Sequence, residues 1–208
     1  MVRHRAHRTL ENALRREGFR CIAGTDEVGR GCLAGPVLAA AVILDPDRHI
    51  PGLADSKLLT ERARERLYDL IVERAVAWAV GAASVAEIDH LNIYWASLEA
   101  MKRAVTALTP RPDVVLVDAF VIPDVSIPQR PIPQGDRRCA AIAAASIVAK
   151  VTRDRLMQAS HAEDPRYGYD RHKGYATAAH LKALRRHGYS PLHRRSFQPA
   201  AMAGRQAR

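Results

Sequence analysis

The chain has 208 residues, of which 48% are hydrophobic and 26% charged, a composition that can bury one sizeable core and that excludes a compositionally disordered chain. Its formal net charge of +10 indicates a polyanionic partner, with nucleic acid favoured over an anionic membrane surface and ordinary solvated arginines as the alternative. The three scattered cysteines include no CxxC pair, which argues against a disulfide framework and a zinc site and fits a reducing cytoplasm. No apolar run approaches the ~20 residues of a membrane span, which argues against a membrane protein.

The N-terminal part of the chain begins with a basic segment and continues into predicted strands. Residues 1–19 lack the apolar h-region of a secretory signal, so we interpret them as a short amphipathic extension before the fold. Residues 20–28 and 35–44 are predicted strands, and the GRGCLAG between them has the turn residues of a hairpin-like reversal. Thr60 is the predicted N-cap of a helix over residues 61–74.

The middle of the chain continues the alternation of strands and helices. Residues 75–84 are a predicted strand, and residues 92–108 a predicted helix that Pro110 ends. The β-branched run at residues 113–120 has the pattern of a central strand. The proline-rich residues 121–136 are predicted to form a loop with one edge strand.

The C-terminal part is predicted to be helical. An alanine-rich helix over residues 139–160 suits close packing, and a last helix runs from Thr177 to Gly188. One sheet with these helices is an α/β or mixed α+β architecture. After Asp170 the chain has nine Lys and Arg residues, no acid and interleaved aromatic residues, which suits phosphate contacts and stacking. The alternative is a solvated basic helix followed by a flexible tail, the interpretation we prefer for residues 199–208.

Four carboxylates lie where predicted strands or turns end. Asp26 and Glu27 end the first strand, Asp118 ends VVLVD, and Asp136 lies in the edge region. Carboxylates that converge on one point repel each other unless a divalent cation neutralises them, and oxygen-only ligands select Mg²⁺ or Mn²⁺ over zinc. Two such ions ~4 Å apart can promote phosphoryl displacement. A basic chain with this cluster is a candidate nuclease.

Each acid also has a structural alternative. Asp26 can pair with Arg30, and Asp118 can cap a following turn. Adjacent residues of a strand point to opposite faces of the sheet. Asp26 and Glu27 therefore share a metal only if the strand bends or ends there.

The GRGCLA segment matches the G-x-G-x-x-G/A dinucleotide pattern only formally. That motif must open a helix, whereas Gly35-Pro36 and a β-rich run follow here. We interpret the segment as a turn in which glycine allows close approach of a ligand and Arg30 contacts a phosphate or carboxylate. A plain turn is the alternative.

Other titratable residues are assigned structural roles. Asp154 lies in a predicted helix between two arginines, and we predict that it forms an ion pair. The histidines lack metal-ligand spacing, so exposed or core-satisfied side chains are predicted for His90, His161, His172, His180 and His187.

Together these segments resemble the type 2 ribonuclease H family, in particular bacterial ribonuclease HII. The resemblance spans about residues 20–198, and eight blocks in the family's order make it specific. The blocks are AGTDEVGRGCLAGPVLAAAVIL, DSKLLTERARERLYDLI, LNIYWASLEAMKRAV, VLVDAF, QGD, IAAASIVAKVTRDRLM, HKGYATAAHLKAL and HGYSPLHRRSF.

The resemblance implies a ribonuclease H-like fold: a central mixed five-stranded sheet flanked by helices, with a helical C-terminal extension. It implies a catalytic domain over residues 20–198, preceded by the extension and followed by the tail. The implied activity is endonucleolytic hydrolysis of RNA in RNA–DNA hybrids, and nicking 5′ of single ribonucleotides in duplex DNA. Two Mn²⁺ or Mg²⁺ ions would act, and the products would carry 3′-hydroxyl and 5′-phosphate ends.

The resemblance also implies roles for individual residues. The metal-binding and catalytic carboxylates would be Asp26, Glu27, Asp118 and Asp136. The turn that reads the 2′-hydroxyl would be Gly29, Arg30 and Gly31, and the tyrosine at the RNA–DNA junction would be Tyr175. More loosely, phosphates would be contacted by Ser56, Lys57, Asn92, Ser146 and Lys150.

Two positions depart from the family pattern, and some properties stay open. Gln134 replaces a common lysine beside the fourth carboxylate, and Cys32 replaces a common proline, so the turn is expected to be less rigid. A monomer is the family expectation, and no membrane contact is expected. A contact with the replication clamp is conceivable, although the chain has no convincing peptide motif for it.

Two rival functions remain at this stage. A non-catalytic nucleic-acid-binding module would explain the charge but leave four acids in unfavourable places. A nuclease of the same fold that cuts DNA junctions would not explain the GRG turn or Tyr175.

Overall fold

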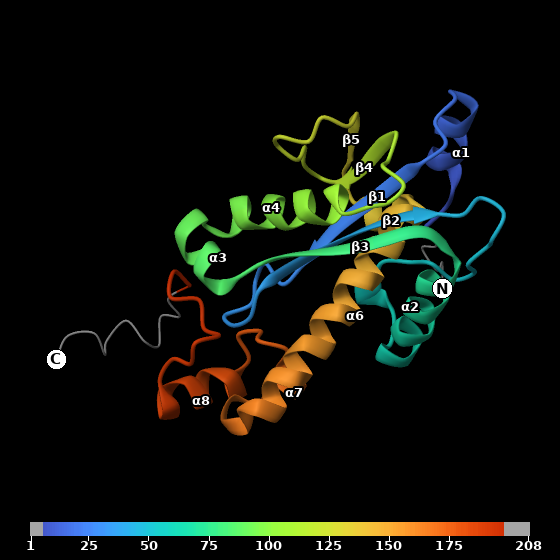
Figure 1. Ribbon diagram of the computed structural model, residues 1–208. Coiled ribbons are helices and arrows are strands. Elements are labelled where there is room, and N and C mark those ends of the chain that lie inside the picture. The colour runs from blue at the N-terminus through green and yellow to red at the C-terminus, as the bar shows by residue number, and fades with distance from the viewer. Residues whose placement is uncertain (1–5, 198–208) are drawn as a thin grey trace.

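The computed structural model describes residues 6–197 (Figure 1). One sheet has the strand order β3-β2-β1-β4-β5. Its strands are β1 (Ile22–Val28), β2 (Val37–Leu44), β3 (Ala75–Ala83), β4 (Val114–Asp118) and β5 (Gln129–Ile132). The α-helices are α1 (Thr9–Arg16), α2 (Glu61–Arg74), α3 (Val85–Leu91), α4 (Ile93–Thr106), α5 (Gly135–Arg138), α6 (Ala140–Glu163), α7 (Tyr169–His172) and α8 (Ala178–His187), with short 3₁₀ turns η1 (Ser56–Leu58) and η2 (Pro165–Tyr167).

The sheet is mixed, as predicted. β1 pairs antiparallel with β2 and parallel with β4, while β5 extends the parallel side and β3 the antiparallel side. Every residue of β2 is buried, because its apolar sequence lies inside the sheet with helices on both faces. The predicted hairpin-like reversal between the first two strands is confirmed.

Helices α6 and α4 pack on opposite faces of the sheet. Alternate residues of β2 separate the two layers: Ala40 packs with the α6 side and Ala41 with the α4 side. The alanine-rich sequence of α6 lets it approach closely, as predicted. At Gly24 an added Cβ would lie 2.2 Å from the backbone carbon of Ala141, so only glycine fits this crossing. This tight layer fixes β1 and its acids against α6.

The helical C-terminal part is also confirmed. Beyond α6, the chain packs a third cluster in which Tyr167 and Tyr169 are buried with Ala34 and Met157. α7 and α8 lie below the sheet in the orange and red part of Figure 1. No helix in residues 6–197 is long and apolar enough to cross a membrane. The predicted tail at residues 199–208 lies outside the described residues.

The described part of the N-terminal extension packs against the sheet and α6. The Glu11 carboxylate is buried and accepts a hydrogen bond of 2.8 Å from the Ala141 amide in the first turn of α6. The Arg8 guanidinium donates to the carbonyl oxygen of Asp45 at 2.6 Å. Helix α1 is amphipathic, as we predicted from the sequence, because one of its faces packs Leu14 into the core. The domain boundary at residue 20 stays a prediction.

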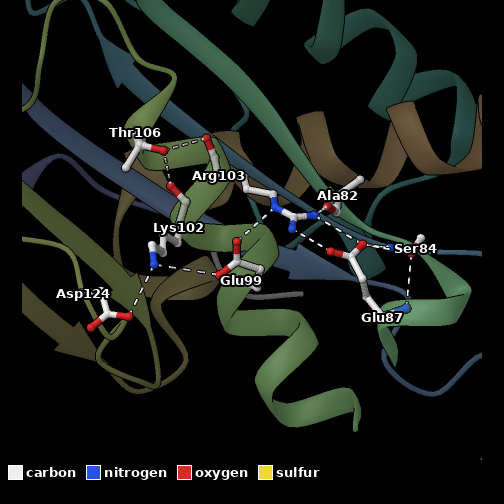
Figure 2. Close-up of polar contacts among 8 residues, drawn as sticks. All are labelled: Ala82, Ser84, Glu87, Glu99, Lys102, Arg103, Thr106 and Asp124. Atoms are coloured by element: carbon white, nitrogen blue, oxygen red, sulfur yellow. Dashed lines mark hydrogen bonds and ion pairs between the residues drawn. The ribbon is translucent and has the colours of Figure 1, made fainter. Parts of the chain in front are cut away.

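A network of ion pairs joins α3, α4 and the loop after β4 (Figure 2). Arg103 contacts Glu87 at 2.6 Å and Glu99 at 3.1 Å, and Lys102 contacts Asp124 in the loop at 3.3 Å. Hydrogen bonds from Arg103 lower the pKa of Glu87 to about 2. The sequence analysis did not predict α3, whose start is a capping box between Ser84 and Glu87.

Candidate active site

The four predicted carboxylates gather where β1, β4 and α5 meet. Asp26 is near the end of β1, and Asp118 ends the neighbouring parallel strand. Asp136 lies in the first turn of α5, and the Asp118 carboxylate accepts a hydrogen bond of 2.8 Å from the Gly135 amide of the same turn. Asp26 and Asp136 are buried to 5% and 6% exposure. The arrangement brings Asp26, Asp118 and Asp136 together, and Asp118 bonds to an amide 17 residues later in the chain and not to the turn that directly follows it.

The electrostatics show that these acids share one site. Burial, followed by the charges of Glu27 and Asp118, raises the pKa of Asp26 well above its usual range, against a hydrogen bond from Ser146. Burial also raises the pKa of Asp136, with further contributions from Asp55 and Asp118. Because carboxylates that raise each other's pKa are repelling each other, the cluster is a high-energy arrangement for anions alone. Such a site favours a positive ligand.

The relation between Asp26 and Glu27 differs from the alternatives drawn from the sequence. β1 remains paired through Val28, so the strand does not end at the two acids, yet the charge of Glu27 raises the pKa of Asp26, which shows that both carboxylates act on one site. It is Glu27, and not Asp26, that pairs with Arg30, at 3.1 Å. Burial raises the pKa of Glu27, Arg30 opposes this shift, and Asp118 adds to it. Glu27 thus connects the acidic cluster to the GRG turn.

The donor chemistry suits a hard divalent cation, although no three acids, imidazoles or thiols within residues 6–197 are arranged to hold a metal ion. Asp118 and Glu27 are held by Gly135 and Arg30 instead. Carboxylate oxygens are the ligands preferred by Mg²⁺ and Mn²⁺. The metal-binding role of the four acids therefore stays a prediction.

A fifth acid, Asp55, belongs to this site, and the sequence analysis missed it. Its buried carboxylate accepts hydrogen bonds from the Lys57 amide at 2.9 Å and from the Arg137 guanidinium at 3.2 Å. The ammonium group of Lys57 lies 3.9 Å from Asp136, where it supplies a positive charge beside the fourth carboxylate. The available signal was the position of Asp55 directly before Ser-Lys, where it caps η1.

Three of the predicted phosphate-contact residues have partners inside the protein. The hydroxyl groups of Ser56 and Ser146 lie 2.9 Å apart and are buried, and Ser146 also bonds to Asp26. The Asn92 side-chain oxygen accepts hydrogen bonds from the amides of Tyr94 and Trp95, so it caps α4. These contacts give the three residues structural roles, and their contact with substrate stays a prediction.

Two buried arginines hold the GRG turn, and the sequence analysis missed both. Arg194 donates to the carbonyl oxygens of Arg30 at 3.0 Å and Gly35 at 2.9 Å. Arg153 donates to the carbonyl oxygens of Ala34 at 3.0 Å and Lys173 at 2.8 Å. Both side chains are fully buried. They tie the turn to the segment that precedes Tyr175.

The GRG turn requires glycine at its first position, whereas the glycine at its third position leaves the backbone uncovered by other protein atoms. Gly29 has φ +95°, and an added Cβ would lie 2.3 Å from the Arg153 Nε. At the exposed Gly31, an added Cβ would meet no protein atom within 4 Å. The backbone at Gly31 is therefore open to a ligand.

The family model of ribonuclease HII matches residues 23–200 of the chain. The chain belongs to the ribonuclease HII family. The ribonuclease HII of Azoarcus sp. (strain BH72) is 59% identical over 181 residues, which cover 87% of this chain and 89% of that protein. The ribonuclease HII of Dechloromonas aromatica (strain RCB) is 56% identical over 180 residues, or 86% of this chain and 92% of that protein.

Solved structures agree with this assignment. The chain is similar to a structure of the PCNA:RNase HII complex from Archaeoglobus fulgidus, with a TM-score of 0.73 and 27% identity, covering 86% of this chain and 96% of that one. Bst-RNase HIII in complex with Mn²⁺ shares the fold, with a TM-score of 0.65 at 22% identity, covering 87% of this chain and 67% of that one. The protein is thus a metal-dependent ribonuclease H, an endonuclease that degrades the RNA of RNA–DNA hybrids.

Next to the turn of this ribonuclease HII, Tyr175 lines a cavity of about 540 Å³. A backbone bridge joins Tyr175 to the buried Cys32, and the Tyr175 ring is 40% exposed. The Lys150 ammonium lies 5.8 Å from the ring centroid and 2.7 Å from Asp154. The predicted ion pair of Asp154 is confirmed, with Lys150 as the partner in place of a neighbouring arginine.

Three buried histidines support the Tyr175 segment. In its neutral form, each of them uses both ring nitrogens in hydrogen bonds. His180 Nδ1 donates to the Tyr175 carbonyl oxygen at 2.9 Å, so its Nε2 accepts from His193 Nε2 at 3.1 Å. His193 Nδ1 accepts from the Ser190 amide at 2.9 Å. His172 stacks on His180 with 4.2 Å between centroids. The prediction of core-satisfied histidines is confirmed for His172 and His180.

We expect this histidine cluster to make stability depend on pH. Burial and the neighbouring His180 lower the pKa of His193 to about 4. Between pH about 6.5 and 4 the unfolded chain binds this proton and the folded one does not, so the free energy of unfolding falls as the pH falls. Over this pH range, one such group lowers the free energy of unfolding by about 3 kcal/mol. Urea unfolding of wild type and His193→Gln at pH 7 and pH 4.5 measures the difference.

The variant should lose most of the His193 contribution to this pH dependence. His90→Gln, which changes an exposed histidine at the end of α3, is the control and should keep the wild-type slope. Equal slopes for His193→Gln and wild type would show that protonation of His193 does not oppose folding.

Proposed function

We propose that this ribonuclease HII nicks duplex DNA on the 5′ side of single embedded ribonucleotides, by a two-metal-ion mechanism that leaves 3′-hydroxyl and 5′-phosphate ends. The observation that carries the proposal is the contact between the acidic cluster and the GRG turn. Glu27 raises the pKa of Asp26 and pairs with Arg30 at 3.1 Å. A phosphodiester at the acids therefore lies within reach of a turn that can test its sugar.

The residues that would hold two Mg²⁺ or Mn²⁺ ions are Asp26, Glu27, Asp118 and Asp136. Their oxygen-only donor set fits these ions, and a cation relieves the repulsion that raises the pKa of Asp26 and Asp136. When bound, the ions supply a water activated for in-line attack and charge stabilisation for the leaving 3′-oxygen. The Mn²⁺ in the similar Bst-RNase HIII structure supports the choice of ion class.

The chain's own residues orient the substrate in this proposal. The 2′-hydroxyl is the group that distinguishes RNA from DNA, and the open backbone at Gly31 allows it to approach. Arg30 contacts the adjacent phosphate while it keeps Glu27 in place. Tyr175 packs below the sugar at the junction, with Lys150 near its ring. Lys57 and Lys150 contact phosphates on the flanking strand.

The assembly of the protein is part of the same proposal. We expect a monomer in a cytoplasmic location, acting on hybrids and on ribonucleotide-containing duplexes. The PCNA:RNase HII complex from Archaeoglobus fulgidus supports testing a sliding clamp as a further partner.

A single nicking assay tests this function. The substrate is duplex DNA with one ribonucleotide, incubated with the protein and Mg²⁺, Mn²⁺ or EDTA. We expect metal-dependent cleavage 5′ of the ribonucleotide, a 3′-hydroxyl that a polymerase extends, and no cleavage in EDTA. Binding without nicking would favour a non-catalytic binding module, and cleavage of all-DNA junctions would favour a junction nuclease.

A further inference from the structure

Four neighbouring residues form an exposed surface beside the GRG turn, which we name the aromatic shelf. Its members are Tyr94, Trp95, Phe120 and Val121, with exposed fractions of 38%, 51%, 41% and 55%. Aromatic side chains normally bury their large apolar area, so a contiguous exposed group marks a binding surface. The active-site residues already described do not include it.

The shelf continues directly from the GRG turn. The Arg30 guanidinium lies 5.9 Å from the centroid of the Phe120 ring. The Phe120 and Tyr94 centroids are 5.6 Å apart, and those of Tyr94 and Trp95 are 5.2 Å apart. Because Arg30 also pairs with Glu27, an unbroken line of side chains leads from the acids to Trp95.

The fold holds the shelf in place. Asn92 caps α4 by accepting from the amides of Tyr94 and Trp95. On the loop, the left-handed φ of +66° at Ala119 turns the chain directly after β4 and precedes Phe120. Preorganisation of this kind reduces the ordering cost of binding.

Two further contacts brace the loop that carries Phe120 and Val121. Lys102 of α4 pairs with Asp124 at 3.3 Å (Figure 2). The Gln129 side chain accepts from the Ile122 amide and donates to the Ile122 carbonyl, each at 2.8 Å. Helix and loop are thus fixed relative to each other, with the shelf across their junction.

We propose that the aromatic shelf binds the strand that flanks the cleavage site, through the apolar faces of its sugars and the edges of its bases. Nucleic acid is the occupant because the shelf touches Arg30, so a protein seated there would cover the turn that must receive substrate. Aromatic side chains bind nucleotides of any sequence by stacking and apolar contact. The net charge of +10 attracts the same partner.

The shelf is a second aromatic contact for the turn. Tyr175 joins the turn through Cys32, whereas Phe120 joins it through Arg30. Successive ring centroids of the shelf are 5.2 Å and 5.6 Å apart with the rings nearly perpendicular, at 79° and 82°, so the shelf offers both ring faces and ring edges over more than the roughly 3.4 Å rise of one nucleotide. The shelf therefore contacts the duplex on one side of the cleavage site and leaves the chemistry unchanged.

Steady-state kinetics with trimmed duplexes test the proposal, which rests on the proposed nicking activity. With a long duplex, Trp95→Ala and Phe120→Ala should each raise KM about tenfold and keep kcat within about twofold. Trimming the duplex on one side of the ribonucleotide should raise the wild-type KM by a similar factor and leave the variants unaffected. Trp78→Ala, which changes an exposed tryptophan on β3, is the matched control.

Tryptophan fluorescence gives a readout that does not depend on nicking. In a Trp78→Phe background, the remaining Trp95 should be quenched by the ribonucleotide duplex in EDTA. An unchanged KM in both shelf variants, or no quenching by a duplex that binds, would overturn the shelf proposal. If the duplex quenched Trp95 of the Trp78→Phe protein, but neither this protein nor the wild type nicked with metal, the proposed nicking function would be overturned and the shelf would stand.

Discussion

Asp118→Asn is expected to reduce metal-dependent cleavage by at least about 10³-fold while substrate binding changes by no more than a few-fold. A metal-held transition state is stabilised by several kcal/mol, and each 1.36 kcal/mol is a factor of ten in rate. Asp118 ends β4 beside Asp26, whose pKa it raises, so the loss of its charge changes the centre of the cluster.

The fold should tolerate this substitution. The Asp118 oxygen accepts a hydrogen bond of 2.8 Å from the Gly135 amide, and the asparagine carboxamide oxygen can accept the same bond. Single-turnover cleavage measures the rate, and gel-shift titration in EDTA measures the affinity. The thermal midpoint should stay near that of wild type.

Asp113→Asn is the matched control for the loss of one charge. Asp113 lies just before β4, is exposed, and accepts hydrogen bonds from the amides of Arg20 and Cys21 at 2.8 Å. Its replacement should leave the cleavage rate within about twofold, because it lies at the opposite end of the strand from Asp118. If Asp118→Asn cleaved as fast as Asp113→Asn, Asp118 would have no part in the chemistry.

The acids could be predicted as site residues from the sequence, because burying a charged side chain in an apolar strand costs free energy. Asp26 and Asp118 follow apolar runs, and parallel pairing of β1 with β4 brings the ends of those runs together. The mixed five-stranded sheet could be anticipated from the family resemblance, whereas the strand order comes from the structure. The pairing of Glu27 with Arg30 could not, since it depends on the path of the turn after Val28.

The buried arginines were hidden by the composition of the chain. Arg194 lies in a run of basic residues whose ordinary interpretation is a solvated face, yet it is fully buried. Arg153 next to Asp154 suggested an ion pair, whereas its guanidinium binds backbone carbonyls more than 100 residues away in the sequence, such as that of Pro36. Only the packing of the C-terminal helices onto the β1–β2 turn creates these contacts. The residues that neighbour these arginines in the sequence do not indicate carbonyl partners so far away in the chain.

Because these contacts hold the turn, we expect Arg194→Met to have a large effect. The substitution leaves the carbonyl oxygens of Arg30 and Gly35 without donors, and each unpaired buried group costs about 1–3 kcal/mol. We expect a loss of roughly 2–6 kcal/mol in the free energy of unfolding. Burial lowers the pKa of Arg194 to about 10, so the side chain is still charged at neutral pH and its hydrogen bonds are charge-assisted.

The same variant should lose discrimination at the ribonucleotide. With Arg30 no longer anchored, the turn shifts relative to the acids, so cleavage next to a single ribonucleotide should fall at least about tenfold more than cleavage of a long RNA–DNA hybrid. Arg195→Met changes the adjacent, exposed arginine and is the control for charge loss. Equal losses on both substrates would identify Arg194 as a residue of general stability, because positioning of the turn predicts the larger loss on the duplex that offers a single 2′-hydroxyl.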